Sequence, residues 1–156
     1  HDVTRIASNL TNPAHLPLAY GILMGMPGIP CIYYGSEWGM EGKKEHGDDA
    51  LRPAVDAPQW TALTDFIARA AKAHRESRAL TYGDFNVLHL TNKQLIFERC
   101  ADGERVLVMV NADGEGYTAH YNANAGCGTD LLTGKHFDFG AGSYLEPYSV
   151  KYIKVQ

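Results

Sequence analysis

One short stretch, residues 28–37, constrains the fold of this chain more than any other. It reads Gly-Ile-Pro-Cys-Ile-Tyr-Tyr-Gly-Ser-Glu, an apolar run with glycine and proline before it and glycine after it. The unbroken apolar residues 31–34 predict a strand buried on both faces, as in the parallel sheet of an α/β protein. Such proteins place their chemistry at the carboxyl ends of strands, so Glu37 is a candidate site residue. A satisfied polar group at a strand end is the alternative.

Apolar residues recur at helical spacing on both sides of this stretch, which predicts helices over residues 14–24 and 58–77. Asp56, followed three residues later by Gln59, is typical of a capped helix start and predicts where the second helix begins. His74 falls on the apolar side of that helix and is expected to be a hydrogen-bonded residue at the edge of the core. A helix, a strand and a second helix in this order are typical of the crossover units of a parallel sheet.

The hydrophobic period changes from helical to alternating near residues 82–84. From there to the end, apolar residues alternate with polar ones in short runs, as in half-buried strands. Turn-forming triplets containing Asn, Asp or Gly separate the runs at residues 91–93, 101–103 and 112–114. Residues 80–156 are therefore predicted to form an antiparallel β-sandwich that folds independently of residues 1–79.

Composition limits the classes of partner and cofactor. The net charge is −4 and the cations are scattered, so neither nucleic acid nor a membrane surface is an expected partner. No apolar run approaches the roughly 20 residues of a spanning helix. The cysteines, Cys31, Cys100 and Cys127, lack metal-ligand spacing, as do the 7 histidines, so no metal or other cofactor is assigned. Reduced, buried thiols in a cytoplasmic protein are expected.

Two motifs carry a resemblance to a known family. Gly28, Pro30, Tyr34, Gly35 and Glu37 match the pattern Gly-x-Pro-x-x-x-Tyr-Gly-x-Glu at the eighth barrel strand of the α-amylase family of glycoside hydrolases. At a helix's distance upstream, the first two residues, His-Asp, resemble the end of that family's Asn-His-Asp motif after the seventh strand. Their order and spacing make the resemblance specific.

The resemblance implies a fold and a set of site residues. Residues 1–79 would be the last two βα units of a (β/α)8 TIM barrel, and residues 80–156 the β-sandwich domain that follows it. The implied catalytic residue is Asp2, a transition-state stabiliser, with His1 binding the same sugar. Asp48 and Arg52 fit the family's Asp-Pro-x-x-Arg pattern, apart from Asp49 in place of proline, and would bind the neighbouring glucose. Glu37 would support the site from behind these residues.

The implied parent is a retaining glycosidase acting on α-1,4-glucans, similar to cyclomaltodextrinases, neopullulanases and maltogenic α-glucosidases. In that family the nucleophile and the acid/base group follow the fourth and fifth strands, which have no counterpart here. We therefore expect a fragment that begins mid-barrel, self-associates, and does not cleave oligosaccharides by itself. A different class, a non-catalytic sugar-binding or scaffold module, is the alternative.

Overall fold

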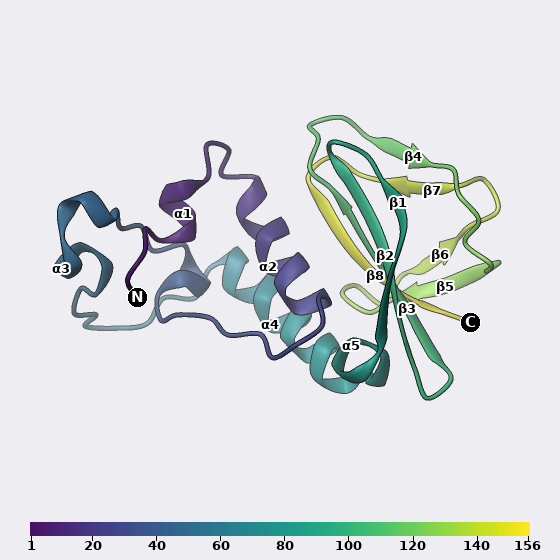
Figure 1. Ribbon diagram of the computed structural model, residues 1–156, viewed down its shortest axis with the longest axis horizontal. Helices are drawn as coiled ribbons and strands as arrows, with labels where there is room; N and C mark the ends of the chain where they lie inside the picture. Colours follow the sequence, from purple (N-terminus) through teal and green to yellow (C-terminus); the bar gives the residue numbers. More distant parts are fainter.

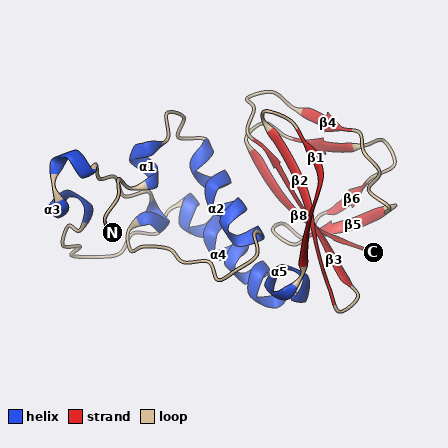
Figure 2. Ribbon diagram, in the orientation of Figure 1, coloured by secondary structure: helices blue, strands red, loops and turns tan.

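The computed structural model describes residues 1–156, and its helices precede its strands along the chain (Figures 1 and 2). The helices are α1 (Ile6–Asn9), α2 (His15–Gly25), α3 (Asp48–Leu51), α4 (Ala62–Glu76) and α5 (Arg78–Tyr82), with 3₁₀ turns at Ser36–Trp38 and Lys44–His46. The strands are β1 (Asp84–Leu90), β2 (Gln94–Ala101), β3 (Glu104–Asn111), β4 (Tyr117–Ala119), β5 (Cys127–Asp130), β6 (His136–Asp138), β7 (Ser143–Leu145) and β8 (Ser149–Val155). None of the helices is long and apolar enough to cross a membrane.

All strand pairs are antiparallel, which confirms the predicted β-sandwich class. A six-stranded sheet has the order β1-β2-β3-β8-β5-β6, and a two-stranded sheet joins β4 to β7. The β2–β3 hairpin turns at Asp102 and Gly103, whose φ angles are 52° and 79°. Positive φ at both positions matches the right-handed twist of the flanking strands, which is why this Asp-Gly pair forms the turn.

The six-stranded sheet is a middle layer, buried on both faces. One face packs against α2 and α4 through Phe97, Val108 and Tyr152. The other face packs against β4 and β7 through Ile96, Leu107 and other apolar residues. Every side chain from 106 to 110 in β3 is therefore buried, whereas alternation predicted a single buried face. The sandwich shares its core with the helices, so the expectation that it folds independently of residues 1–79 is no longer supported.

Close packing and hydrogen bonds join helix α2 to the sheet. A Cβ atom on Gly21 would lie 2.8 Å from Cγ2 of Val150, so only glycine lets the helix approach β8. The Tyr152 hydroxyl donates a hydrogen bond to the Gly21 carbonyl. The fully buried Arg99 donates from Nη1 to the Gly25 carbonyl at 2.7 Å, and from Nη2 to the Gly83 carbonyl at 2.9 Å. The buried guanidinium thus satisfies carbonyls at the ends of α2 and α5.

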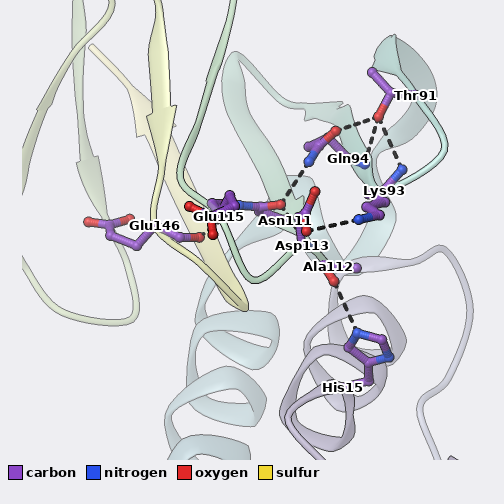
Figure 3. Close-up of polar contacts among 9 residues, drawn as sticks. All are labelled: His15, Thr91, Lys93, Gln94, Asn111, Ala112, Asp113, Glu115 and Glu146. Carbon is purple, nitrogen blue, oxygen red and sulfur yellow. Dashed lines mark hydrogen bonds and ion pairs between the residues drawn. The ribbon is translucent and has the colours of Figure 1, made fainter. Parts of the chain in front are cut away.

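A second set of polar contacts lies around Asn111, the last residue of β3 (Figure 3). The fully buried Asn111 donates from Nδ2 to the carbonyls of Glu115 at 2.8 Å and Glu146 at 3.0 Å. Its Oδ1 accepts from Gln94 Nε2 at 2.9 Å and from the Asp113 amide at 3.0 Å. One amide side chain therefore ties the end of β3 to the loops around it.

The predicted helices form, with one shifted start. α2 matches the expected range of 14–24 closely, and the Nδ1 atom of His74 lies 2.8 Å from the Met24 carbonyl, as expected of a core-edge residue. α4 begins at Ala62 rather than at residue 58, because Thr61 and Thr64 form a reciprocal capping box. The predicted cap at Asp56 was therefore wrong, and Trp60 lies before the helix with 73% of its surface exposed.

Two further predictions were wrong. Residues 30–34 belong to neither sheet, since no other strand lies beside them to pair with their backbone, and the crossover unit is not formed.

The cysteines are free, as expected, but they are not buried: Cys31 is exposed, and Cys100 and Cys127 are half-buried. Cys31 is exposed because the predicted strand that would have enclosed it does not form.

Candidate functional site

The structure brings together four of the residues that the sequence singled out. Arg52 Nη2 lies 2.8 Å from Asp2 Oδ1 and 3.4 Å from Asp48 Oδ2, so one guanidinium group bridges both carboxylates. On its other oxygen, Asp2 is 2.9 Å from Nε2 of His1. Arg52 Nε also donates to the His1 carbonyl at 3.3 Å. Residues separated by about 50 positions thus form a single polar cluster, His1–Asp2–Asp48–Arg52.

Lys44, in the same loop as Asp48, stabilises the charge of the Asp48 carboxylate. Asp48 starts the short helix α3, and its carboxylate accepts a hydrogen bond from Lys44 in the preceding 3₁₀ turn. The hydrogen bond and the positive charge of Lys44, together with the charge of Arg52, hold the pKa of Asp48 below its usual range. The Asp48 carboxylate therefore stays ionised and available as a hydrogen-bond acceptor.

Arg5 is the anchor beneath this cluster. Its guanidinium donates to the Leu51 carbonyl at 2.7 Å, to the Tyr34 carbonyl at 2.8 Å and to Ser36 Oγ at 3.3 Å. The side chain is buried, and its charged group lies 5.0 Å from the centre of the Tyr33 ring. Arg5 lies three positions after Asp2, and Leu51 directly precedes Arg52, so this contact fixes both halves of the cluster relative to each other.

A cavity of about 410 Å³ opens beside the cluster. Its wall is mostly apolar, and Asp2, Asp48 and Arg52 do not line it. Residues of the wall that also belong to the cluster or its anchor are His1, Arg5, Tyr33, Ser36 and Leu51. The polar cluster therefore forms an open rim, and the cavity lies next to it.

Glu37 is not part of the cluster. It lies in the 3₁₀ turn Ser36–Trp38, and its backbone carbonyl accepts a hydrogen bond from Thr64 Oγ1 at 2.9 Å. Its Oε2 atom is buried and has no hydrogen-bond partner. A buried carboxylate oxygen without a partner is costly, so the satisfied strand-end group considered above does not describe this side chain.

The cluster suits recognition of a polar, uncharged ligand. Its side chains are open to solvent, with 63% of Asp2 and 40% of Arg52 exposed, so their ion pairs add at most about 1 kcal/mol to stability. Two carboxylates offer acceptors and one guanidinium offers fixed donors, the groups that bind hydroxyls. No group of three or more His, Cys, Asp or Glu side chains in the chain could hold a metal ion.

Sequence reasoning missed Arg5 and Lys44. Arg5 lies within the Asp-Val-Thr-Arg segment, but its partners Tyr34 and Leu51 are 29 and 46 positions away, and they accept through backbone carbonyls. No residue type marks such an acceptor. Lys44 lies four positions before Asp48, a spacing at which opposite charges meet on a helical turn, and this signal was available in the sequence.

Comparison with known proteins gives a family match over the helical half. The profile described as alpha amylase, catalytic domain, matches residues 1–84. The cyclomaltodextrinase of Thermoanaerobacter pseudethanolicus is 29% identical over 159 residues, covering 99% of this chain and 27% of that protein. The alpha-amylase of Niallia circulans is 27% identical, covering 92% of this chain and 26% of that protein. The chain thus spans about a quarter of the length of these curated relatives.

Solved structures share the fold over the whole chain. The alpha-amylase from Geobacillus thermoleovorans, complexed with acarbose, superposes with a TM-score of 0.87 at 23% identity, covering 100% of this chain and 37% of that one. The maltogenic amylase from S. marinus superposes with a TM-score of 0.79 at 26% identity, covering 99% of this chain and 21% of that one. The arrangement of helices and sheets described above is therefore also found in these enzymes.

Proposed function

Since the chain belongs to the α-amylase family, we propose that it is the C-terminal part of a retaining glycoside hydrolase that acts on α-1,4-glucans. In this proposal residues 1–79 complete the catalytic barrel and residues 80–156 form the domain that follows it. The observation that carries the proposal is the bridge from Arg52 to Asp2 and Asp48, because it unites two separately matched motifs at one site.

Asp2 is the proposed transition-state stabiliser. As the sugar ring flattens and gains positive charge, the hydrogen bonds from its hydroxyls to an ionised carboxylate strengthen. Arg52 at 2.8 Å and His1 at 2.9 Å hold the Asp2 carboxylate in one orientation before the substrate arrives. Electrostatic groups fixed in advance require no reorganisation during the reaction, which is the basis of their effect on rate.

The remaining groups have different proposed roles. His1 donates a hydrogen bond to the same sugar, and Asp48 with Arg52 binds the adjacent glucose unit. Glu37 supports the site from behind, and its Oε2 atom is buried there without a hydrogen-bond partner. A retaining mechanism also needs a nucleophile and an acid/base carboxyl group about 5 Å apart, and these would come from other parts of the longer protein.

The experiment that tests the proposal is Asp2→Ala in the full-length protein. We expect kcat on a maltooligosaccharide to fall by about 100- to 1,000-fold with a small change in KM, since the contacts of Asp2 strengthen in the transition state. Asp102→Ala is the matched control, because Asp102 is equally exposed and also pairs with an arginine, Arg78 at 2.8 Å. Near-normal turnover of Asp2→Ala would contradict the proposed function.

The 156-residue chain by itself is proposed to be inactive and to self-associate. Apolar side chains outside the sheet core, such as Ile29 at 96% exposed and Val3 at 72%, favour association. Light scattering and an assay for sugar release from maltooligosaccharides and cyclodextrins test both points. A monomeric chain that releases sugar would overturn them.

A further inference from the structure

The chain contains two Asp-Gly pairs, Asp102-Gly103 and Asp113-Gly114. In such a pair the glycine nitrogen can attack Cγ of the aspartate, because no glycine side chain shields that nitrogen. A carbon–nitrogen bond forms, and one carboxyl oxygen leaves as water with the amide proton, which closes a five-membered succinimide ring. Water then opens the ring. When the bond to the former backbone carbonyl breaks, the product is isoaspartate, in which the chain runs through Cγ and the α-carboxylate is free.

The Asp102-Gly103 pair forms the tip of the β2–β3 hairpin and is accessible to this chemistry (Figure 1). The side chain of Asp102 is 62% exposed, and no atom lies within 4 Å of the place that a Cβ atom would take on Gly103. The Gly103 amide donates no hydrogen bond to the rest of the chain. Exposed tips of this kind open at a low cost in free energy, so the nitrogen and the carboxyl carbon can meet.

The Asp113-Gly114 pair has the same two residue types in a closed setting. The Asp113 amide donates to Asn111 Oδ1 at 3.0 Å, and its carbonyl accepts from the Tyr148 amide at 2.9 Å. A Cβ atom on Gly114 would lie 2.9 Å from the Tyr148 hydroxyl oxygen. The hydrogen bond from Lys93 holds the pKa of Asp113 below its usual range, which disfavours the neutral carboxyl group that loses water. This pair therefore serves as a reference within the same chain.

Arg78 restrains the Asp102 carboxylate. Its Nε atom donates to Asp102 Oδ2 at 2.9 Å, and its Nη2 atom lies 2.8 Å from the same oxygen. Arg78 is the first residue of α5, so these contacts tie the hairpin tip to that helix. A succinimide carries no charge, and its formation abolishes the ion pair. Loss of that stabilisation on the way to the ring slows the reaction.

We propose that Asp102 is a site of isoaspartate formation in the folded chain, and that Arg78 slows the reaction there. The modified residue is a substrate for an isoaspartate-specific methyltransferase, which transfers a methyl group from S-adenosylmethionine to the free α-carboxylate. Neither Asp102 nor Arg78 belongs to the His1–Asp2–Asp48–Arg52 cluster.

The modification has a structural consequence at the hairpin. Isoaspartate adds one carbon to the backbone of a two-residue turn whose ends, Ala101 and Glu104, pair across the hairpin. Because loop length selects the geometry of a hairpin turn, the modified tip has to rearrange. Glu104 also accepts a hydrogen bond from the Ala79 amide at 3.2 Å, so the rearrangement reaches the contact between the sheet and α5.

Incubation of the 156-residue chain at neutral pH for several weeks, followed by peptide mapping, tests the proposal. Diagnostic fragment ions and methyl transfer by an isoaspartate methyltransferase identify the modified residue. We expect isoaspartate in the peptide that contains Asp102 and about tenfold less at Asp113, whose backbone hydrogen bonds must break first. In urea, where both pairs are unfolded, the two rates should become similar. Asp102→Glu should abolish the signal, since glutamate would have to close a six-membered ring.

The role of Arg78 is tested separately. Arg78→Ala should raise the rate at Asp102 by about two- to fivefold, the factor that corresponds to loss of one exposed ion pair, and leave Asp113 unchanged. Arg75→Ala is the matched control, because Arg75 is also an exposed arginine but is not the partner of Asp102. Melting midpoints establish that the variants are folded.

Two results would overturn the proposed site: no isoaspartate at Asp102 in the folded chain, or equal amounts at Asp102 and Asp113. An equal rate at Asp102 in the wild type and in Arg78→Ala would overturn the role of Arg78.

Discussion

At the scale of single residues, Asn111 shows how one side chain can hold several loops. The side chain is fully buried and makes four hydrogen bonds, so removing the amide leaves two carbonyls, a backbone amide and the Gln94 side chain without these partners (Figure 3). We predict that Asn111→Ala lowers the free energy of unfolding by about 2–4 kcal/mol, measured by chemical denaturation. The exposed turn residue Asn92 is the control, and Asn92→Ala should change it by less than about 0.5 kcal/mol. If Asn111→Ala and Asn92→Ala lowered the free energy of unfolding equally little, the Asn111 amide would be dispensable.

In the candidate site, Arg52 is the single residue that links several others, since its guanidinium bridges Asp2 and Asp48. If it binds a neighbouring glucose unit rather than the reacting one, Arg52→Ala in the full-length protein should weaken use of long oligosaccharides by about tenfold or more in kcat/KM. The effect on an aryl glycoside with a single glucose should be several times smaller. Arg78→Ala, which removes an exposed arginine paired with Asp102, should leave both substrates unaffected. An equal loss on both substrates would contradict the assigned role.

At the scale of elements, helix α2 approaches strand β8 only because residue 21 is glycine. A Cβ atom there would lie 2.8 and 2.9 Å from the two methyl groups of Val150. We predict that Gly21→Ala costs about 1–3 kcal/mol of unfolding free energy, since packed cores absorb extra atoms poorly.

The matched test of this contact is the double variant. The double variant Gly21→Ala with Val150→Ala should lose less unfolding free energy than the two single variants lose in total. The reason is that Val150→Ala removes the methyl groups that clash with the added Cβ atom. Gly126→Ala, with no atom within 4 Å of the added Cβ, serves as the control. Strict additivity in denaturation experiments would show that the clash is relieved in another way.

At the scale of the whole molecule, Glu104 links the helices to the sheet in a pH-dependent way. Its carboxylate accepts from the Ala79 amide at 3.2 Å and lies 3.1 Å from Lys154 Nζ. Burial raises the pKa of Glu104, but these hydrogen bonds, with one from Ser77, outweigh it and lower the pKa below the usual value. A lowered folded-state pKa means that the stabilisation is present above the unfolded value, about 4.3, and is lost as the pH falls through the folded value.

We therefore predict that the melting temperature of the wild type falls more steeply below about pH 4.3 than that of Glu104→Gln. Glu104→Gln should be the less stable protein at pH 7, and the two melting curves should converge on acidification. Glu76→Gln, on the exposed side of α4, provides the control. A difference between wild type and Glu104→Gln that is independent of pH would contradict this linkage.

Because the helices and the sandwich share a core, we expect the sandwich to be less stable without the helices. Residues 80–156 alone would expose Phe97, Val108 and Tyr152, which pack against α2 and α4 in the whole chain. We predict that this truncated protein aggregates or melts at a lower temperature than residues 1–156, as scanning calorimetry and light scattering would show. A soluble truncation with an unchanged melting temperature would mean that the helices add little to the core.

The sequence by itself determined features that depend on neighbouring residues. Alternating side chains and the Asp-Gly turn at 102–103 predicted the antiparallel strands, because both signals act within a few residues. The residues of two short motifs, Asp2 with His1 and Asp48 with Arg52, were identified from their resemblance to motifs of a known family, before their contacts were known. Their roles in a reaction stay predictions that the kinetic experiments test.

Tertiary structure decided the features that depend on distant partners. Residues 31–34 and residues 106–110 are both unbroken apolar runs, but only the second has strands on each side and layers on both faces. A strand needs neighbours for its backbone hydrogen bonds, and no local pattern supplies them. Arg5 gives the same lesson for the site, since it holds Leu51 through a carbonyl 46 positions away. Such contacts exist only once the chain has folded, because backbone acceptors are identical in every residue.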